Sequence, residues 1–169
     1  GRAWDETLFD ELVLVGGGIG ITPLHSTFRE LRHRSQAAPQ AERVAVELHW
    51  VAQSASQLEL LSQSLADAME ATGCAADDDF HVGLYATRET DKSRTTVRAG
   101  VDAAGRERTL PVTLARPNWR EILTKKQRDA AAFDKRIGVM VCGPAPLVDS
   151  LSELTRELGI AFHKEVFEF

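Results

Sequence analysis

The sequence predicts a doubly wound α/β domain, in which helices cover both faces of a parallel β-sheet. Short, continuous apolar runs alternate along the chain with segments of helical periodicity, the order expected for such a sheet. A cluster of glycines directly follows the first apolar run, as at the ligand-binding edge of many such sheets. The 169 residues, 43% of them hydrophobic and 27% charged, suffice for one domain with its own core. We therefore expect residues 1–169 to form a single domain.

Four apolar runs are short and uninterrupted, which is typical of strands buried on both faces of a parallel sheet. These predicted strands comprise residues 12–15, 44–52, 80–86 and 137–141. Three further segments carry apolar residues at helical intervals of three or four. These predicted helices comprise residues 23–34, 56–71 and 144–158. Gly159 is a stop signal for the last helix, and residues 160–162 follow it as a short edge strand.

The segment between the third and fourth predicted strands is rich in Thr, Arg, Gly and Asp and has almost no apolar periodicity. We expect a flexible insertion at residues 88–115, because loops of this length in compact domains are often functional or disordered. Residues 80–140 carry 13 Lys and Arg against 7 Asp and Glu, whereas the rest of the chain is acidic. This basic region is either a solvated loop of mixed charges or a lip that attracts an anionic ligand.

The composition also excludes several classes of protein. The net charge of −5 argues against a nucleic-acid binder. No window approaches the roughly 18 apolar residues of a transmembrane helix, and the first residues do not resemble a signal peptide, so we expect a soluble chain. Cys74 and Cys142 form no disulfide framework, and the five histidines have no partners at metal-ligand spacing. We therefore expect no metal site.

The glycine-rich turn after the first strand is the strongest functional signal. Gly16, Gly17, Gly18 and Gly20 permit a sharp turn and a close approach of phosphate to backbone amides at the start of a helix. Thr22 is a suitable N-cap and Pro23 suits the first helical position. The turn is not a P-loop, and it does not match G-x-G-x-x-G, because Ile21 stands at the third glycine position. A purely structural role for the glycines is the alternative.

A second turn of the same kind follows the fourth strand, at Cys142, Gly143 and Pro144. Since the carboxyl ends of parallel strands meet at one edge of a sheet, both turns should face one cleft. Cys142 is placed to touch a ligand there. The alternative is a buried small hydrophobic residue, the commonest role of an unpaired cysteine.

Four motifs occur in order along the chain, at residues 14–23 (LVGGGIGITP), 116–119 (RPNW), 137–144 (IGVMVCGP) and 162–167 (FHKEVF). Together they resemble the nicotinamide-binding half of the NADPH oxidase and ferric reductase family. The first and third motifs resemble the wider ferredoxin reductase superfamily, whereas the second and fourth point to the oxidase branch. The resemblance implies a ferredoxin-reductase-like nucleotide-binding lobe.

By this resemblance, the glycine turn with Thr22 and Pro23 would hold the pyrophosphate and flank the nicotinamide. Cys142, with Gly143 and Pro144, would lie beside the nicotinamide. Phe167 would cover the flavin ring. Phe167 and Cys142 are therefore the two candidate catalytic residues. The family ends at that aromatic residue, but Glu168 and Phe169 follow here, so Phe169 is a second candidate for the flavin contact.

One departure from the family pattern concerns the choice of cofactor. In the oxidases the second strand usually ends in a Cys-Arg pair whose arginine meets the 2′-phosphate of NADPH. This chain has Gln53 there. Arg88, in a Thr-Arg-Glu sequence after the third strand, resembles the Ser-Arg-Glu by which ferredoxin reductases bind that phosphate. Its alternative role is that of a solvated loop charge.

The resemblance implies the NADPH-binding lobe of a flavin-dependent transmembrane oxidoreductase. Such a lobe delivers hydride from NADPH, or NADH, to FAD, and electrons pass through haems to oxygen, giving superoxide, or to ferric chelates. We expect the FAD-binding domain and the haem-containing transmembrane domain to lie outside this chain, which would sit at the cytoplasmic face of a membrane. The alternatives are a soluble ferredoxin-reductase-like flavoprotein and a nucleotide-sensing module without turnover.

Overall fold

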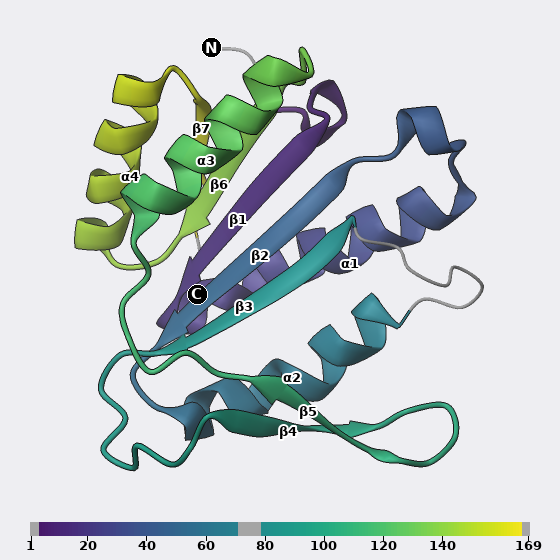
Figure 1. Ribbon diagram of the computed structural model, residues 1–169, viewed down its shortest axis with the longest axis vertical. Coiled ribbons are helices and arrows are strands. Elements are labelled where there is room, and N and C mark those ends of the chain that lie inside the picture. The colour runs from purple at the N-terminus through teal and green to yellow at the C-terminus, as the bar shows by residue number, and fades with distance from the viewer. Residues whose placement is uncertain (1–3, 71–78, 167–169) are drawn as a thin grey trace.

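The computed structural model describes residues 4–70 and 79–166. Its centre is a parallel sheet of five strands in the order β3-β2-β1-β6-β7 (Figure 1). The strands are β1 (Glu11–Gly17), β2 (Ala45–Ala52), β3 (Phe80–Ala86), β6 (Ile137–Cys142) and β7 (Ala161–Lys164). Each predicted strand is present, and β7 forms the predicted edge.

Helices cover both faces of the sheet, which confirms the doubly wound α/β class. α1 (Ile21–Ala37) and α2 (Ala55–Met69) pack on one face, and α3 (Trp119–Ala132) and α4 (Ala145–Leu158) on the other. In Figure 1, α1 passes behind the strands and α3 passes in front of them. Three short 3-10 turns complete the fold: η1 (Glu6–Leu8), η2 (Gly18–Gly20) and η3 (Gln40–Glu42).

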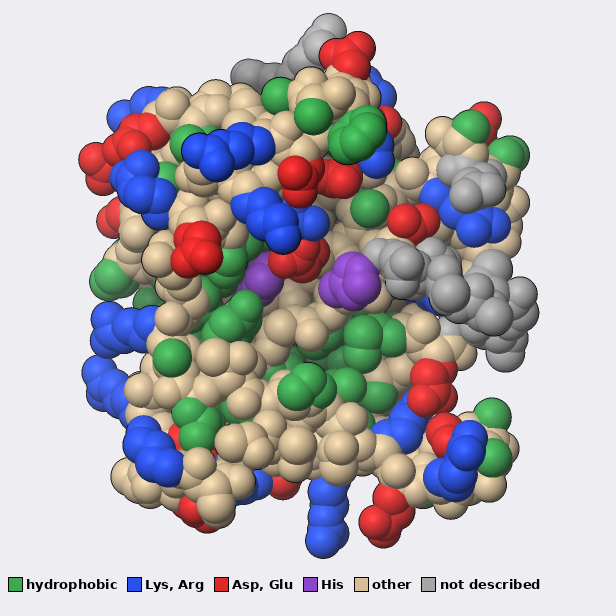
Figure 2. Space-filling view, in the orientation of Figure 1, with side chains coloured by type: hydrophobic (Ala, Val, Ile, Leu, Met, Phe, Trp, Pro, Cys, Tyr) green, Lys and Arg blue, Asp and Glu red, His purple; other side chains and the backbone are tan. Residues whose placement is uncertain are grey.

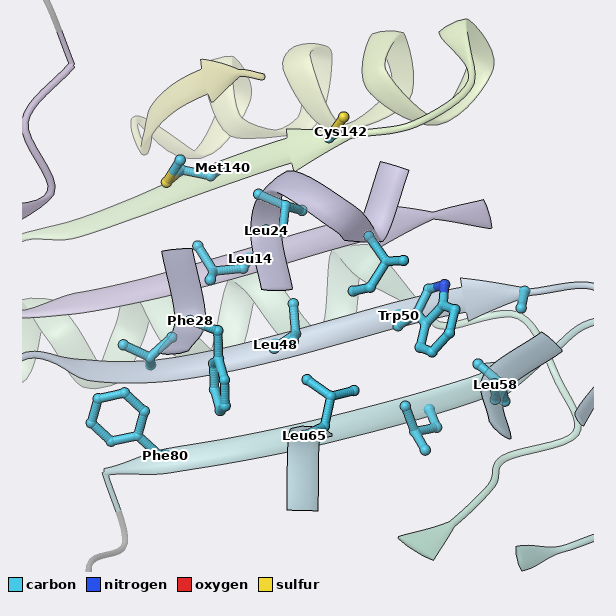
Figure 3. Close-up of a cluster of buried hydrophobic side chains, with 14 of the residues drawn as sticks. Leu14, Leu24, Phe28, Leu48, Trp50, Leu58, Leu65, Phe80, Met140 and Cys142 are labelled. Atoms are coloured by element: carbon cyan, nitrogen blue, oxygen red, sulfur yellow. The ribbon is translucent and has the colours of Figure 1, made fainter. Parts of the chain in front are cut away.

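Burial on both faces explains the continuous apolar runs. In β1, Leu12 and Leu14 belong to the core cluster under α1 and α2, while Val13 and Val15 belong to the cluster under α3 and α4. All four side chains are almost completely buried. Figure 3 shows the first cluster, where side chains from the sheet meet those of α1 and α2. The carboxyl edge of the sheet is therefore supported by packed cores on both faces.

The insertion expected at residues 88–115 contains regular structure that the sequence did not indicate. An antiparallel hairpin, β4 (Thr96–Val101) and β5 (Glu107–Pro111), packs along α2 (Figure 1). Only every second side chain of β4 is buried, Val97 and Ala99, so the apolar signal is short. Arg108 joins the hairpin to α2 through ion pairs with Asp67 and Glu70. Tertiary contacts with α2 thus order a segment whose own composition is typical of a loop.

Helix α3 was not expected from the sequence. Among its residues only Leu123 and Ala130 are buried, so the apolar stripe is too narrow to stand out from its polar surroundings. The local start signal is nevertheless present, because the Asn118 side chain accepts a hydrogen bond from the Glu121 amide at 3.1 Å. This cap places the start of α3 beside the carboxyl edge of the sheet.

The predicted helix caps were partly wrong. Thr22 is not the N-cap of α1, because the helix begins at Ile21, directly after η2, and Gly20 occupies the cap position without a side-chain bond. Pro23 is consequently the third helical residue, not the first. Pro144 is the N-cap of α4, one residue before the helix. Gly159 ends α4 as predicted, in the left-handed conformation with φ of 69°.

Candidate functional site

Two adjoining pockets open at the carboxyl edge of the sheet, where ligands bind in doubly wound folds. The first, of about 530 Å³, is called here the strand-end pocket. Its lining residues come from the glycine turn, the ends of β2 and β3, the segment before α3, and the start of α4. They include Gly18, Gln53, Arg88, Arg116 and Trp119.

The second pocket, of about 510 Å³, is called here the tail-side pocket. It is lined by the glycine turn, by Cys142, Gly143 and Pro144 after β6, and by residues 164–166 after β7. Gly17, Gly18 and Pro144 line both pockets. A ligand long enough to occupy both would therefore pass directly over the glycine turn.

The four glycines of the turn serve two different purposes. A Cβ on Gly20 would lie 2.3 Å from the carbonyl oxygen of Cys142, and one on Gly17 would lie 2.8 Å from a Leu147 methyl group. A Cβ on Gly16 would lie 3.0 Å from the Ile21 Cα. These three glycines permit close packing. Gly18 differs, because its φ is +57° and a Cβ would find no atom within 4 Å. Gly18 lines both pockets.

The two glycine turns meet, as their positions in the sequence predict. A Cβ on Gly143 would lie 3.1 Å from the Cα of Gly17, so the second turn packs directly on the first. Cys142 ends β6 and is only 3% exposed, with its side chain in the core cluster under α1 and α2. It also lines the tail-side pocket. Cys142 is therefore a core residue that also lines the pocket, and its contact with a ligand stays a prediction.

Arg88 and Gln53 lie side by side at the rim of the strand-end pocket. The loop after β3 is bonded to the end of β2, since the Thr87 amide donates to the Ala52 carbonyl at 2.9 Å and the Arg88 amide donates to the Gln53 carbonyl at 2.8 Å. The Arg88 side chain is exposed, and within residues 4–70 and 79–166 its guanidinium has no hydrogen bond or ion pair. It is available to a ligand.

Arg116 is a second exposed cation on the strand-end pocket, and the described part of the chain offers its guanidinium no partner either. From the sequence, Arg116 was noted only as part of the Arg-Pro-Asn-Trp motif and not as a site residue. Most other cations of the basic region are engaged in ion pairs, such as Arg94 with Glu59 and Arg106 with Asp102. The solvated-loop interpretation thus fits the hairpin, whereas an anion-attracting lip fits Arg88 and Arg116.

Glu89, next to Arg88, serves the fold. Its carboxylate accepts hydrogen bonds from the Ala55 amide at 3.0 Å and the Asp91 amide at 3.2 Å. These bonds, with the nearby Arg94, lower the pKa of Glu89 below its usual value. Because Ala55 is the first residue of α2, the carboxylate caps the positive end of that helix.

Trp119, which lines the strand-end pocket, packs against a buried polar network around His49. His49 is 4% exposed; its Nδ1 pairs with the Tyr85 hydroxyl and its Nε2 with Glu47, both at 2.8 Å. Burial raises the pKa of Glu47, but hydrogen bonds from His49 and Lys126 outweigh it and lower that pKa to about 2. The Trp119 ring packs edge-on against His49 at 5.5 Å. On the face of the molecule seen in Figure 2, histidine side chains lie beside hydrophobic ones.

Some predicted site residues do not meet the pockets. Gly16 lies within β1, and Thr22 and Pro23 lie in the first turn of α1; none of the three lines either pocket. Phe167 and Phe169 lie outside the described residues, as does Cys74. Their predicted roles therefore remain predictions.

Two further properties of the described residues concern membranes and metal ions. None of their helices has both the length and the apolar composition needed to cross a membrane. Within the same residues, no three His, Cys, Asp or Glu side chains come together in a way that could hold a metal ion.

Comparisons with known proteins agree with the motifs. Residues 9–156 match the family model described as the ferric reductase NAD binding domain. Over 98% of its length the chain is 27% identical to respiratory burst oxidase homolog protein B of Solanum tuberosum and 26% identical to the protein of that name from Arabidopsis thaliana. The chain spans 22% of the length of each relative.

A solved structure shares the fold. The flavohemoglobin of Malassezia yamatoensis, crystallised with bound FAD and heme, is similar over 97% of this chain and 33% of that chain, with a TM-score of 0.57 at 20% identity. This likeness concerns the fold alone. The family match, which covers most of the chain, confirms the resemblance that the four motifs indicated. The chain belongs to the ferric reductase NAD binding domain family.

Proposed function

We propose that this chain is the NADPH-binding part of a flavin-dependent transmembrane oxidoreductase that delivers hydride from NADPH to FAD. The observation that carries the proposal is the pair of adjoining pockets that share Gly17 and Gly18. A dinucleotide is elongated, with a charged pyrophosphate between two ring systems. Two pockets joined by an open glycine turn suit that shape.

The strand-end pocket is suited to the adenosine half of the cofactor. Arg88 and Arg116 place two unpaired cations at its rim, where a 2′-phosphate would be bound by charge-assisted hydrogen bonds. Gln53 lies beside Arg88, and its side-chain amide would contact the ribose that carries this phosphate. This arrangement favours NADPH, with NADH as a cofactor that would lose only the contacts to the phosphate.

The tail-side pocket is suited to the nicotinamide. NADPH, when bound, supplies a hydride from C4 of its nicotinamide ring, and the protein's contribution is to orient that ring. Cys142, Gly143 and Lys164 are among the lining residues of this pocket. Ile19 is 64% exposed and Val166 is 62% exposed, so the rim is apolar and fits contact with a flat flavin ring or the domain that holds it. Phe167 or Phe169 would then cover the flavin face.

Other domains are implied by this function. The relatives are several times longer than this chain, which supports an FAD-binding domain and a haem-containing transmembrane domain in the same protein. The nucleotide-binding part would then lie at the cytoplasmic face of the membrane. By analogy with the respiratory burst oxidase homologues, we propose oxygen as the final electron acceptor, giving superoxide. The name of the family model favours a second candidate, the reduction of ferric chelates.

The experiment has two parts. The 169-residue chain should bind NADPH, retain no flavin in stoichiometric amount, and consume NADPH only when the flavin domain is supplied. Binding without hydride loss in the presence of the flavin domain would instead support a nucleotide-sensing module. In the complete, flavin-loaded protein, superoxide formation that exceeds ferric chelate reduction supports the oxidase. The reverse result supports the ferric reductase.

A further inference from the structure

Trp50 connects the hydrophobic core to the glycine turn. Trp50 is 3% exposed and belongs to the core cluster under α1 and α2. Figure 3 shows its ring among the side chains of that cluster. Its Nε1–H donates a hydrogen bond to the carbonyl oxygen of Gly18 at 3.0 Å. The same carbonyl accepts a hydrogen bond from the Ile21 amide. One side chain of β2 is thus hydrogen-bonded to Gly18, a glycine that borders both pockets.

Gly18 needs such an anchor, because glycine is the residue least restricted to one backbone conformation. Gly18 has a φ of +57°, and it has no side chain that could pack and so restrict the peptide that joins it to Ile19. Turning that peptide over would break the bonds from both Trp50 and Ile21. The indole therefore favours a single orientation of this peptide.

That orientation matters for a bound anion. In a planar trans peptide the N–H and C=O groups point in opposite directions. Because the Gly18 carbonyl points toward Trp50 in the core, the Ile19 N–H points away from the core. Ile19 and Gly18 line the tail-side pocket, so this N–H is presented on the pocket side. Inward carbonyls and outward amides suit a pyrophosphate, whereas an outward carbonyl would repel it.

We propose that Trp50 is a positioning residue for pyrophosphate binding: its indole N–H holds the Gly18–Ile19 peptide with the amide toward the ligand. This inference rests on the proposed function, since it requires that a dinucleotide crosses the glycine turn. The pyrophosphate is common to NADPH and NADH, so a substitution of Trp50 should lower the affinity for both cofactors equally. In this it differs from Arg88, which would affect only NADPH.

The test compares Trp50→Phe with Trp4→Phe in titrations of the chain with NADPH and NADH. Trp4 is a matched control, because its Nε1 is buried, finds no hydrogen-bond partner among the described residues, and lies in a residue that lines neither pocket. Trp50→Phe should weaken the binding of both cofactors about five- to tenfold, which is the loss expected for one hydrogen bond. Trp4→Phe should leave both affinities within about twofold of the wild type.

A measurement on the wild type covers the case in which Trp50→Phe folds poorly. The ¹H–¹⁵N resonance of the Trp50 indole should shift when NADP⁺ saturates the chain, while that of Trp4 stays in place. Equal affinities in Trp50→Phe and wild type, or an unmoved Trp50 resonance at saturation, would overturn this inference alone. A wild type that binds neither cofactor would overturn the proposed function and this inference with it.

Discussion

The Arg88 amide donates a hydrogen bond to the Gln53 carbonyl oxygen over 2.8 Å, which joins the ends of β3 and β2 at the rim of the strand-end pocket. The family pattern places an arginine at the end of the second strand, where this chain has Gln53. The backbone bond brings the Arg88 side chain to the same rim from the neighbouring strand. A cation is therefore retained beside the expected 2′-phosphate site, although it comes from another part of the sequence.

The first prediction concerns cofactor preference. Arg88→Ala should weaken NADPH binding about ten- to a hundredfold, because a charge-assisted hydrogen bond is worth about 1.5 to 3 kcal/mol. NADH affinity should hardly change. Arg98→Ala is the matched control, since Arg98 is an exposed arginine of the same basic region that lines neither pocket. Calorimetric titrations decide the point: equal losses for both cofactors would mean that Arg88 only supports the fold.

The second prediction concerns the open glycine of the turn. Gly18→Ala should reduce NADPH and NADH affinity at least tenfold, because the methyl group would stand where the phosphate must approach. Gly105→Ala is its control: Gly105 also has positive φ, +79°, with no atom within 4 Å of an added Cβ, but it lies in the hairpin turn. Both variants should lose about 1 kcal/mol of stability from backbone strain. Similar nucleotide affinity in the two would assign Gly18 a structural role.

The third prediction separates Gly20 from Gly18. A Cβ on Gly20 would lie 2.3 Å from the Cys142 carbonyl oxygen, so Gly20→Ala must push the two glycine turns apart. We expect a loss of about 2 kcal/mol or more in the free energy of unfolding, as for an overpacked core. Urea denaturation measures it directly. A variant as stable as Gly18→Ala would show that the two turns can separate at little cost.

The fourth prediction concerns acid stability. The pKa of Glu47 is about 2 in the folded chain against a usual value of 4.5, so its ionised form favours folding. This stabilisation, on the order of 2 kcal/mol, is present above about pH 5 and is lost as the pH falls toward 2. Glu47→Gln should therefore be less stable than the wild type at pH 7, and the difference should shrink in acid.

The control for Glu47 is Glu30→Gln, which removes an exposed carboxylate paired with Arg34 one helical turn away. Exposed pairs of this kind contribute about 0.3 to 0.5 kcal/mol, so this variant should follow the wild-type pH profile closely. Denaturation curves at several pH values compare the three proteins. A constant difference between Glu47→Gln and wild type from pH 7 to pH 3 would contradict the assignment.

The sequence predicted the parts of the fold whose signal is local. β3 was predicted with the observed bounds, Phe80–Ala86, because it is an apolar run ended by polar residues. The hairpin and α3 were missed, since their burial depends on α2 and on the sheet, and few of their own residues are apolar. Regular structure that owes its stability to neighbours leaves only a weak pattern in the chain.

The candidate site shows the same division. The meeting of the two glycine turns follows from the topology, so the sequence was sufficient to predict it. The distinct roles of Gly18 and Gly20 depend on the atoms that an added Cβ would meet: for Gly20 these come from Cys142 and Gly143, more than 100 residues later, and for Gly18 none of the described residues supplies any within 4 Å. The availability of Arg116 likewise depends on which arginines find acidic partners in the folded chain.

The central claim is that one dinucleotide crosses the glycine turn and occupies both pockets. Titration of the ¹⁵N-labelled chain with NADP⁺ tests it residue by residue. We predict that amide resonances of Gly18, Arg88 and Gly143, which belong to the shared turn and to the two pockets, shift together with one dissociation constant. Gly105, in the hairpin turn, should not shift. An unchanged spectrum at millimolar nucleotide, or shifts confined to residues outside the two pockets, would contradict the account.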